Sequence, residues 1–159
     1  MSAARVRQAI EQFLALVVRP DPATEHDLVA LMNALDELSL VARTLDPDLE
    51  FEGGHPDPPN HDYWEYLAQA QMRFPGLPLY NIPDLVTVSP GDSKITLGDP
   101  YDDIADMRKD LEGVSWRFEH TSENDALWHC ELGYRSHWGY HLTNLRWCLF
   151  YHQFEPPAA

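Results

Sequence analysis

The residues with the clearest chemical potential are two histidines in the second half of the chain. His137 and His141 lie four positions apart in the stretch HWGYH. On a helix this spacing brings both imidazoles to one face, an arrangement that helical metal sites use. The stretch lacks the glutamate of the HExxH motif of metalloproteases. The spacing alone therefore leaves open a metal site and a pair of hydrogen-bonded structural histidines.

Four aspartates form a second group, some thirty positions earlier. They are Asp102, Asp103, Asp106 and Asp110. On a helical wheel Asp103 and Asp110 border the apolar face, so packing of that face withdraws their carboxylates from water and calls for a partner. The candidate partners are Arg135, His137, His141 and Arg146. We expect an arginine, because a guanidinium can bind a carboxylate through two N–H groups.

These two groups support two interpretations. In the first, the aspartates and the Arg/His set form a structural polar network between helices, and the protein has no cofactor. In the second, His137 and His141 combine with aspartates of the preceding helix to hold a divalent metal for an enzyme. The sequence favours the network, because two histidines one turn apart are common in helices without a metal.

Five predicted helices position these residues, and together they indicate one all-α domain over residues 1–159. Apolar spacings of three and four predict helices over 2–18 and 24–45. Thr24 is expected to cap the second helix and Asn60 a third over 60–74. Asp99 followed by Pro100 is typical of a helix start and predicts a fourth helix, with Ile104 on its apolar face.

The fifth helix is expected to run from Ser122 to about Gln153. At ~1.5 Å per residue it would be about 45 Å long, with Gly133 or Gly139 marking a bend or a close contact. Its apolar residues cover nearly the whole wheel, which is typical of a buried helix, so we expect it to be the centre of the bundle. Its aromatic residues are Trp128, Tyr134, Trp138, Tyr140, Trp147, Phe150, Tyr151 and Phe154.

Two segments interrupt the helical pattern. Residues 46–60 carry four prolines and two glycines among acidic residues, and predict an exposed, poorly packed acidic loop. Residues 76–99 predict an irregular connection, in which residues 86–88 and 94–97 could pair as a short hairpin.

The composition limits the possible functions. The chain has 159 residues, with 11 Lys+Arg against 26 Asp+Glu and a net charge of −15. This charge argues against binding to nucleic acids or to anionic membranes, since both require clustered Lys and Arg. The sequence shows no export signal, and Cys130 and Cys148 are too far apart on one helix for a disulfide, so we expect free thiols and a cytoplasmic location. The leading hypothesis is an acidic interaction module, of adaptor or inhibitor type, that binds a basic protein.

The stretches DDIADMRKDLEGV (102–114) and HWGYHLTNLRW (137–147) resemble a bacterial family of small helical proteins that has no established activity. In that family an Asp-Asp-x-Ala-Asp-x-x-x-Asp-Leu helix precedes a His-Trp-Gly-x-His helix with a downstream arginine. The resemblance implies a helical bundle and a polar cluster, and implies no reaction. Members often have tyrosine where Arg108 stands. The matching positions are Asp102, Asp103, Asp106, Asp110, His137, Trp138, Gly139, His141 and Arg146.

Overall fold

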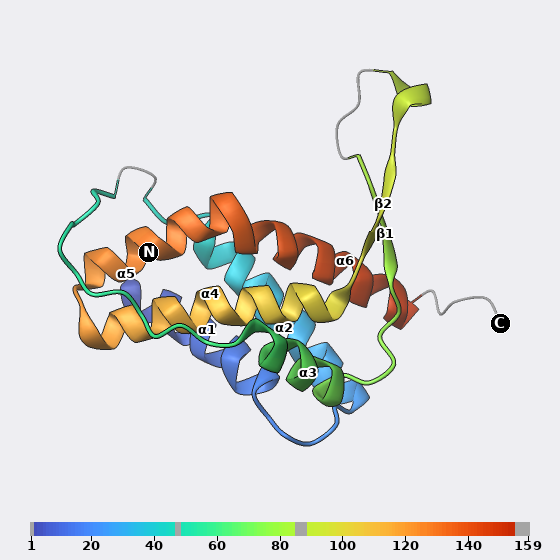
Figure 1. Cartoon of the computed structure of the whole chain (residues 1–159), viewed down its shortest axis with the longest axis horizontal. Coiled ribbons are helices and arrows are strands. Elements are labelled where there is room, and N and C mark those ends of the chain that lie inside the picture. Colours follow the sequence, from blue (N-terminus) through green and yellow to red (C-terminus); the bar gives the residue numbers. More distant parts are fainter. Residues whose placement is uncertain (1, 47–48, 85–88, 155–159) are drawn as a thin grey trace.

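A computed structural model describes residues 2–46, 49–84 and 89–154. It is a helical bundle from which one β-hairpin projects (Figure 1). The elements, in chain order, are α1 (Ala3–Val17), α2 (Glu25–Ala42), α3 (Tyr63–Arg73), β1 (Tyr80–Pro83), the 3₁₀ turn η1 (Pro90–Asp92), β2 (Ile95–Gly98), α4 (Pro100–His120), α5 (Glu123–Gly133), the π-helical segment η2 (Tyr134–Trp138) and α6 (Gly139–Phe154). The predicted helical fold is confirmed, and no helix in the described ranges is both long and apolar enough to cross a membrane.

Side-chain caps explain where the helices begin. Thr24 forms a capping box with Asp27 at the start of α2, as its sequence position predicted. Asp99 caps α4, and Ser122 caps α5 by accepting a hydrogen bond from the backbone N–H of Asp125. The prediction for α3 is wrong by two residues, because Asp62 rather than Asn60 accepts the N-terminal backbone hydrogen bond.

The centre of the bundle is α4, which contacts α1, α3, α5 and α6 (Figure 1). Its apolar face buries Ile104, Met107, Leu111 and Val114. The prediction that the last helix is central is therefore wrong. The helical wheel behind this prediction counted the aromatic residues of the last helix as core. Several of them are on the surface, since folded proteins expose many apolar side chains.

The C-terminal helix is long, as predicted, but it is buried along one face only. The wide turn η2 lies between α5 and α6, and Trp138 within it is fully buried. The outer face of α6 is exposed, because only its inner face packs on α2 and α4. The exposed aromatic residues are Tyr140, Trp147, Phe150, Tyr151 and Phe154.

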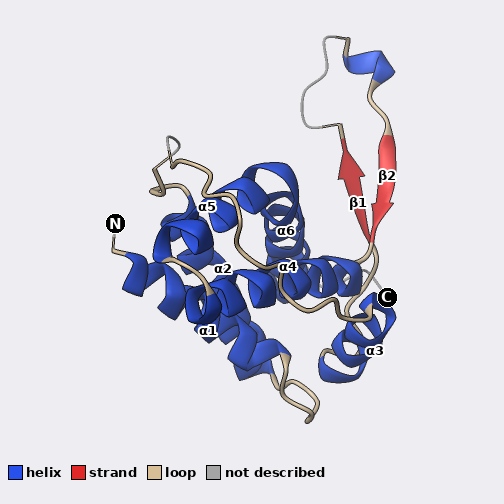
Figure 2. Ribbon diagram, turned by 60° about the vertical axis from the view of Figure 1, so that its left-hand side comes forward, coloured by secondary structure: helices blue, strands red, loops and turns tan. Residues whose placement is uncertain are grey.

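The connection before α4 contains the hairpin of β1 and β2, which stands away from the helices (Figure 2). The strands are antiparallel, and Tyr80 pairs with Gly98. The predicted first strand, residues 86–88, lies outside the described residues, and the strand that pairs with β2 begins earlier, at Tyr80. Only glycine fits at position 98, because a Cβ atom there would overlap the Tyr80 ring.

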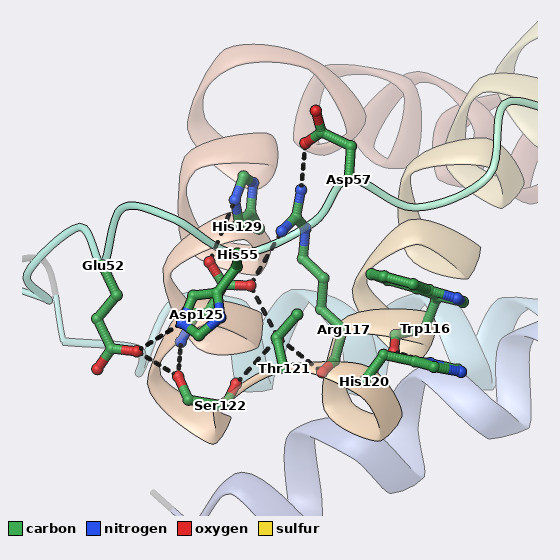
Figure 3. Close-up of polar contacts among 10 residues, drawn as sticks. All are labelled: Glu52, His55, Asp57, Trp116, Arg117, His120, Thr121, Ser122, Asp125 and His129. Atoms are coloured by element: carbon green, nitrogen blue, oxygen red, sulfur yellow. Dashed lines mark hydrogen bonds and ion pairs between the residues drawn. The ribbon is translucent and has the colours of Figure 1, made fainter.

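The described part of the acidic segment 46–60 is largely exposed but well anchored, so the prediction of poor packing is wrong. Glu52 accepts a hydrogen bond from the Ser122 hydroxyl, and Asp57 pairs with the guanidinium of Arg117 at 3.1 Å (Figure 3). The Phe51 ring lies 4.6 Å from that of Trp128. Sequence reasoning missed these contacts because the partners lie 60 or more positions away.

Candidate metal centre

The structure brings the aspartates of α4 against the histidines of the C-terminal helix. Asp103 Oδ1 lies 2.8 Å from His141 Nδ1, and Asp110 Oδ2 lies 2.8 Å from His137 Nδ1. The earlier aspartate, Asp103, contacts the later histidine, His141, and Asp110 contacts His137. Two Asp–His pairs thus stand side by side, with the imidazole centroids 4.9 Å apart.

These contacts determine which imidazole nitrogen remains available. A carboxylate only accepts hydrogen bonds, so the Nδ1 atoms of His137 and His141 donate, and in the neutral imidazole the lone pair is on Nε2. Proteins orient many metal-binding histidines in this way, through a carboxylate that accepts a hydrogen bond from the other ring nitrogen. The neutral form of both histidines therefore has the tautomer that a metal ligand needs.

Asp106 supplies a third ligand atom. Its Oδ2 lies 3.5 Å from His141 Nε2, close to the separation of about 3.4 Å that two ligands have at a tetrahedral metal with ~2.1 Å bonds. One ligand atom each from Asp106, His137 and His141 can be chosen so that all lie within 4.8 Å of one another. Asp106, His137 and His141 form a two-histidine, one-carboxylate set, which suits zinc, iron and manganese.

Two tyrosines that sequence reasoning missed donate hydrogen bonds to Asp102 and Asp103. Tyr63 of α3 donates to Asp102, and Tyr80 of β1 donates to Asp103. Burial and the neighbouring carboxylates raise the pKa of both phenols, so both stay protonated donors. No spacing rule could have found them, since they lie on a different helix and on the hairpin. The two hydroxyls orient the Asp102 and Asp103 carboxylates, and because they are uncharged they do not neutralise the negative charge of these carboxylates.

The electrostatics of the cluster favour a cation. Burial raises the pKa of the Asp103 and Asp106 carboxyls above their ordinary range. Burial alone would lower the pKa of His141, but its hydrogen bond to Asp103 and the charges of Asp103, Asp106 and Asp102 outweigh that effect and raise it. Among the described residues, no Arg or Lys forms an ion pair with the four aspartates of this cluster. The cluster therefore holds excess negative charge that a divalent ion would compensate.

The arginine partners expected from the sequence are elsewhere. Arg135 pairs with Glu131, one turn before it, and Arg146 pairs with Asp36 of α2. Both arginines are substantially exposed, whereas His141 is largely buried beside Asp103. The expectation that arginine is the preferred partner is wrong, because the shorter imidazole reaches the α4 carboxylates inside the interface.

The turn η2 contains His137, and His141 follows it in the first turn of α6. Trp138 anchors η2 in the core and donates its indole N–H to the Cys130 carbonyl at 3.3 Å. A Cβ atom at Gly139 would overlap the Tyr134 carbonyl oxygen, and one at Gly133 would lie 2.8 Å from the Trp138 ring. The glycines and the tryptophan thus allow the wide turn, a feature frequent at functional sites.

A cleft of about 760 Å³ opens beside the candidate centre, between residues 57–61 and the helices α4 and α5. Asp110 and His137 line it on the side of the cluster. The His137 side chain is 46% exposed, so solvent and small molecules can reach its imidazole. The cleft therefore gives solvent access to the His137 side of the cluster.

A second polar cluster, which sequence reasoning did not find, lies at the other end of the cleft (Figure 3). Arg117 is buried and pairs with buried Asp125 at 2.9 Å. Asp125 also accepts from Thr121 at 2.8 Å, and its Oδ1 lies 3.6 Å from His129 Nε2. Burial and the Arg117 charge lower the pKa of His129, which favours its neutral form. These contacts connect α4, α5 and the acidic segment, which is a structural role.

The comparisons with known proteins agree with this fold. The crystal structure of protein BF1032 from Bacteroides fragilis superimposes with a TM-score of 0.77 and 18% sequence identity, over 98% of this chain and 94% of that one. This similarity shows the shared fold. No curated protein matches the chain. A family profile described as a domain of unknown function, DUF5063, matches residues 2–155. The family expected from the Asp-rich and His-Trp-Gly-x-His helices is thereby identified, and the chain belongs to the DUF5063 family.

Proposed function

We propose that the protein binds a divalent transition-metal ion through His137, His141 and Asp106 and is a metal-dependent enzyme. The observation that carries the proposal is the pair of Asp–His contacts at 2.8 Å beside a third carboxylate, Asp106, whose Oδ2 lies 3.5 Å from His141 Nε2. A structural network needs only the hydrogen bonds. It does not need Asp106 placed so that it, His137 and His141 each offer a ligand atom within 4.8 Å of the others.

Three protein ligands leave at least one coordination position open for water or substrate, as in catalytic zinc sites. A metal held this way lowers the pKa of its bound water and polarises a carbonyl or phosphoryl oxygen. The cleft lined by His137 and Asp110 supports this use, because a purely structural metal site would be closed. Asp103 and Asp110 would orient the imidazoles, and Tyr80 would hold Asp103 in place.

Metal titration tests the proposal. The chain is stripped with EDTA and titrated separately with zinc, manganese and, without oxygen, ferrous iron, with binding followed by calorimetry and by metal analysis. We expect one ion per chain, and a rise in melting temperature of about 5–10 °C at a hundredfold excess over Kd. His137→Ala and Asp106→Asn should lose most of this affinity. His26→Ala, which removes an exposed histidine of α2, is the control.

The proposal is overturned if none of the three metals binds at one equivalent, or if His137→Ala and Asp106→Asn retain wild-type affinity. The cluster is then a structural network. Both substitutions remove partly exposed side chains, so the folded variants remain available for the measurement.

A second candidate is the cytoplasmic interaction module that binds a basic protein. The net charge of −15 and the exposed Glu50 on the anchored acidic segment support it. The free thiols of Cys130 and Cys148 suit a reducing compartment. Glu50→Lys should weaken binding of a lysine-rich peptide at low salt without changing the melting temperature. Equal binding by Glu50→Lys and the wild type would remove the segment as the docking surface.

A further inference from the structure

A second cavity, separate from the cleft at the metal centre, lies between the hairpin and α6. Its volume is about 570 Å³, within the range of small-molecule sites. Leu79, Ile82 and Ile95 line it from the hairpin side, and Trp147 and Tyr151 line it from α6. The described lining residues include no Asp, Glu, Lys or Arg. The cavity is thus an uncharged, largely apolar space with one aromatic wall, formed by Trp147 and Tyr151, whose ring centroids lie 5.5 Å apart on α6.

Two polar side chains that line this cavity have nitrogen atoms without partners. Asn144 is only 7% exposed, and its Nδ2 makes no hydrogen bond in the described structure. The same holds for His152 Nδ1. A buried amide without a partner destabilises the fold, and native proteins rarely keep one without a reason. Leucine would fill the Asn144 position at no such cost, so the amide indicates a ligand that binds to it.

We propose that this cavity binds a small, uncharged, planar molecule with one hydrogen-bond acceptor, such as a carbonyl oxygen, for the Asn144 amide. The aromatic wall of Trp147 and Tyr151 suits a flat apolar body that packs on it. An anion is disfavoured by the charge of −15 and by the absence of Lys and Arg among the described lining residues. An ammonium ion cannot accept the hydrogen bond that Asn144 offers.

The site does not depend on the metal centre. Tyr80 lines the cavity, and its hydroxyl binds Asp103, so the two sites are neighbours. All polar and apolar groups that the proposal uses belong to the hairpin and α6, and none is a candidate metal ligand. The experiment is therefore carried out with EDTA present, and its outcome is independent of whether a metal binds.

The test compares two probes of nearly equal shape, 2-acetylnaphthalene and 2-isopropenylnaphthalene, of which only the first has an acceptor oxygen. Each is titrated against Nile red, a neutral planar dye, in competition followed by dye fluorescence. We expect the ketone to bind about fivefold more tightly to the wild type, as one net hydrogen bond provides. Asn144→Leu should bind both probes equally, and Trp147→Ala should weaken both. Phe150→Ala, which removes an exposed α6 aromatic outside the cavity lining, is the control.

Asn144→Leu also separates the ligand role from a structural one. It removes the unpartnered amide, so the variant should melt at or above the wild-type temperature. The proposal is overturned if neither probe displaces the dye, if Asn144→Leu keeps the preference for the ketone, or if Phe150→Ala weakens binding as much as Trp147→Ala.

Discussion

Asp103 on α4 and His141 on α6 meet at 2.8 Å, although 38 positions separate them in the chain. The Asp103 side chain is 4% exposed and also accepts the Tyr80 hydroxyl hydrogen bond. One carboxylate therefore joins α4, α6 and the hairpin. It connects the stability of the fold to the orientation of a candidate metal ligand, and the two effects can be measured separately.

The first prediction concerns this carboxylate. Asp103→Ala should lower the free energy of unfolding by about 2–4 kcal/mol, because it leaves the Tyr80 hydroxyl and His141 Nδ1 without partners. Urea denaturation measures this loss. Asp36→Ala removes an exposed carboxylate that pairs with Arg146, and should cost less than about 1 kcal/mol. Equal costs for the two variants would mean that Asp103 does not join the elements.

The second prediction is the pH dependence of the metal-free protein. Asp103, Asp106 and His141 all have raised pKa values in the folded state, so the folded chain binds these protons more tightly than the unfolded chain. Their contribution to stability is present below the unfolded pKa values, about 4 for the carboxyls and about 6.5 for histidine. It is lost as pH rises through the folded ones. Because the lowered pKa of His129 acts in the opposite direction, the test compares the wild type with His141→Ala in EDTA. Between pH 6 and pH 8 the melting temperature of the wild type should fall more, or rise less, than that of the variant.

With metal present the dependence should reverse, because ligands must be deprotonated to bind. The stabilisation by added zinc should grow between pH 6 and pH 8. A pH dependence that is the same with and without metal would argue against coordination by these residues.

The third prediction compares two helix glycines. Gly139→Ala should destabilise the fold by about 1–3 kcal/mol and weaken metal binding, because the new methyl group would overlap the Tyr134 carbonyl and displace η2. Gly113→Ala places its Cβ at an ordinary 3.5 Å from Pro58, and should be stabilising by about 0.5–1 kcal/mol. Thermal unfolding of both variants, with and without zinc, checks the difference. If Gly139→Ala leaves the free energy of unfolding unchanged, the helix can replace the wide turn η2 by regular α-helix.

The fourth prediction concerns the second polar cluster. Arg117→Met should lower the free energy of unfolding by about 3–5 kcal/mol, since it leaves the buried Asp125 carboxylate without its cation. The Asp57 side chain, the other partner of Arg117, is 94% exposed. Asp57→Asn removes only the charge of this exposed partner and should cost about 0–1 kcal/mol. Denaturation in urea distinguishes them. Comparable losses would indicate that the acidic segment, and not the buried pair, stabilises this end of the bundle.

The sequence predicted the features that depend on local chemistry. Thr24, Asp99 and Ser122 cap helices as their positions indicate, because a cap is settled within one turn. The helix periodicity also placed Asp103 and Asp110 at the border of a packed face, where the structure has them.

Features that depend on distant segments were not predictable in this way. Tyr63 and Tyr80 reach the aspartates from elements whose positions only the tertiary fold defines. Arginine was expected opposite Asp103 because its charge and geometry are favourable, but Arg146 lies nearer Asp36. The wheel also assumed 100° per residue through residues 134–138, where the wide turn adds a residue and offsets all later positions.

The wide turn η2 also has a sequence signature by which it can be recognised in other proteins. Gly133 and Gly139 are both required to be small, one by the Trp138 ring and the other by the Tyr134 carbonyl. A protein with the same glycine pair around a tryptophan should share the offset. A protein of the same length with a larger residue in place of either glycine should have a regular helix here, with everything after it rotated by about 100°. In such a relative the second histidine would face away from the aspartates, so the glycine pair would separate members able to build the centre from members that are not.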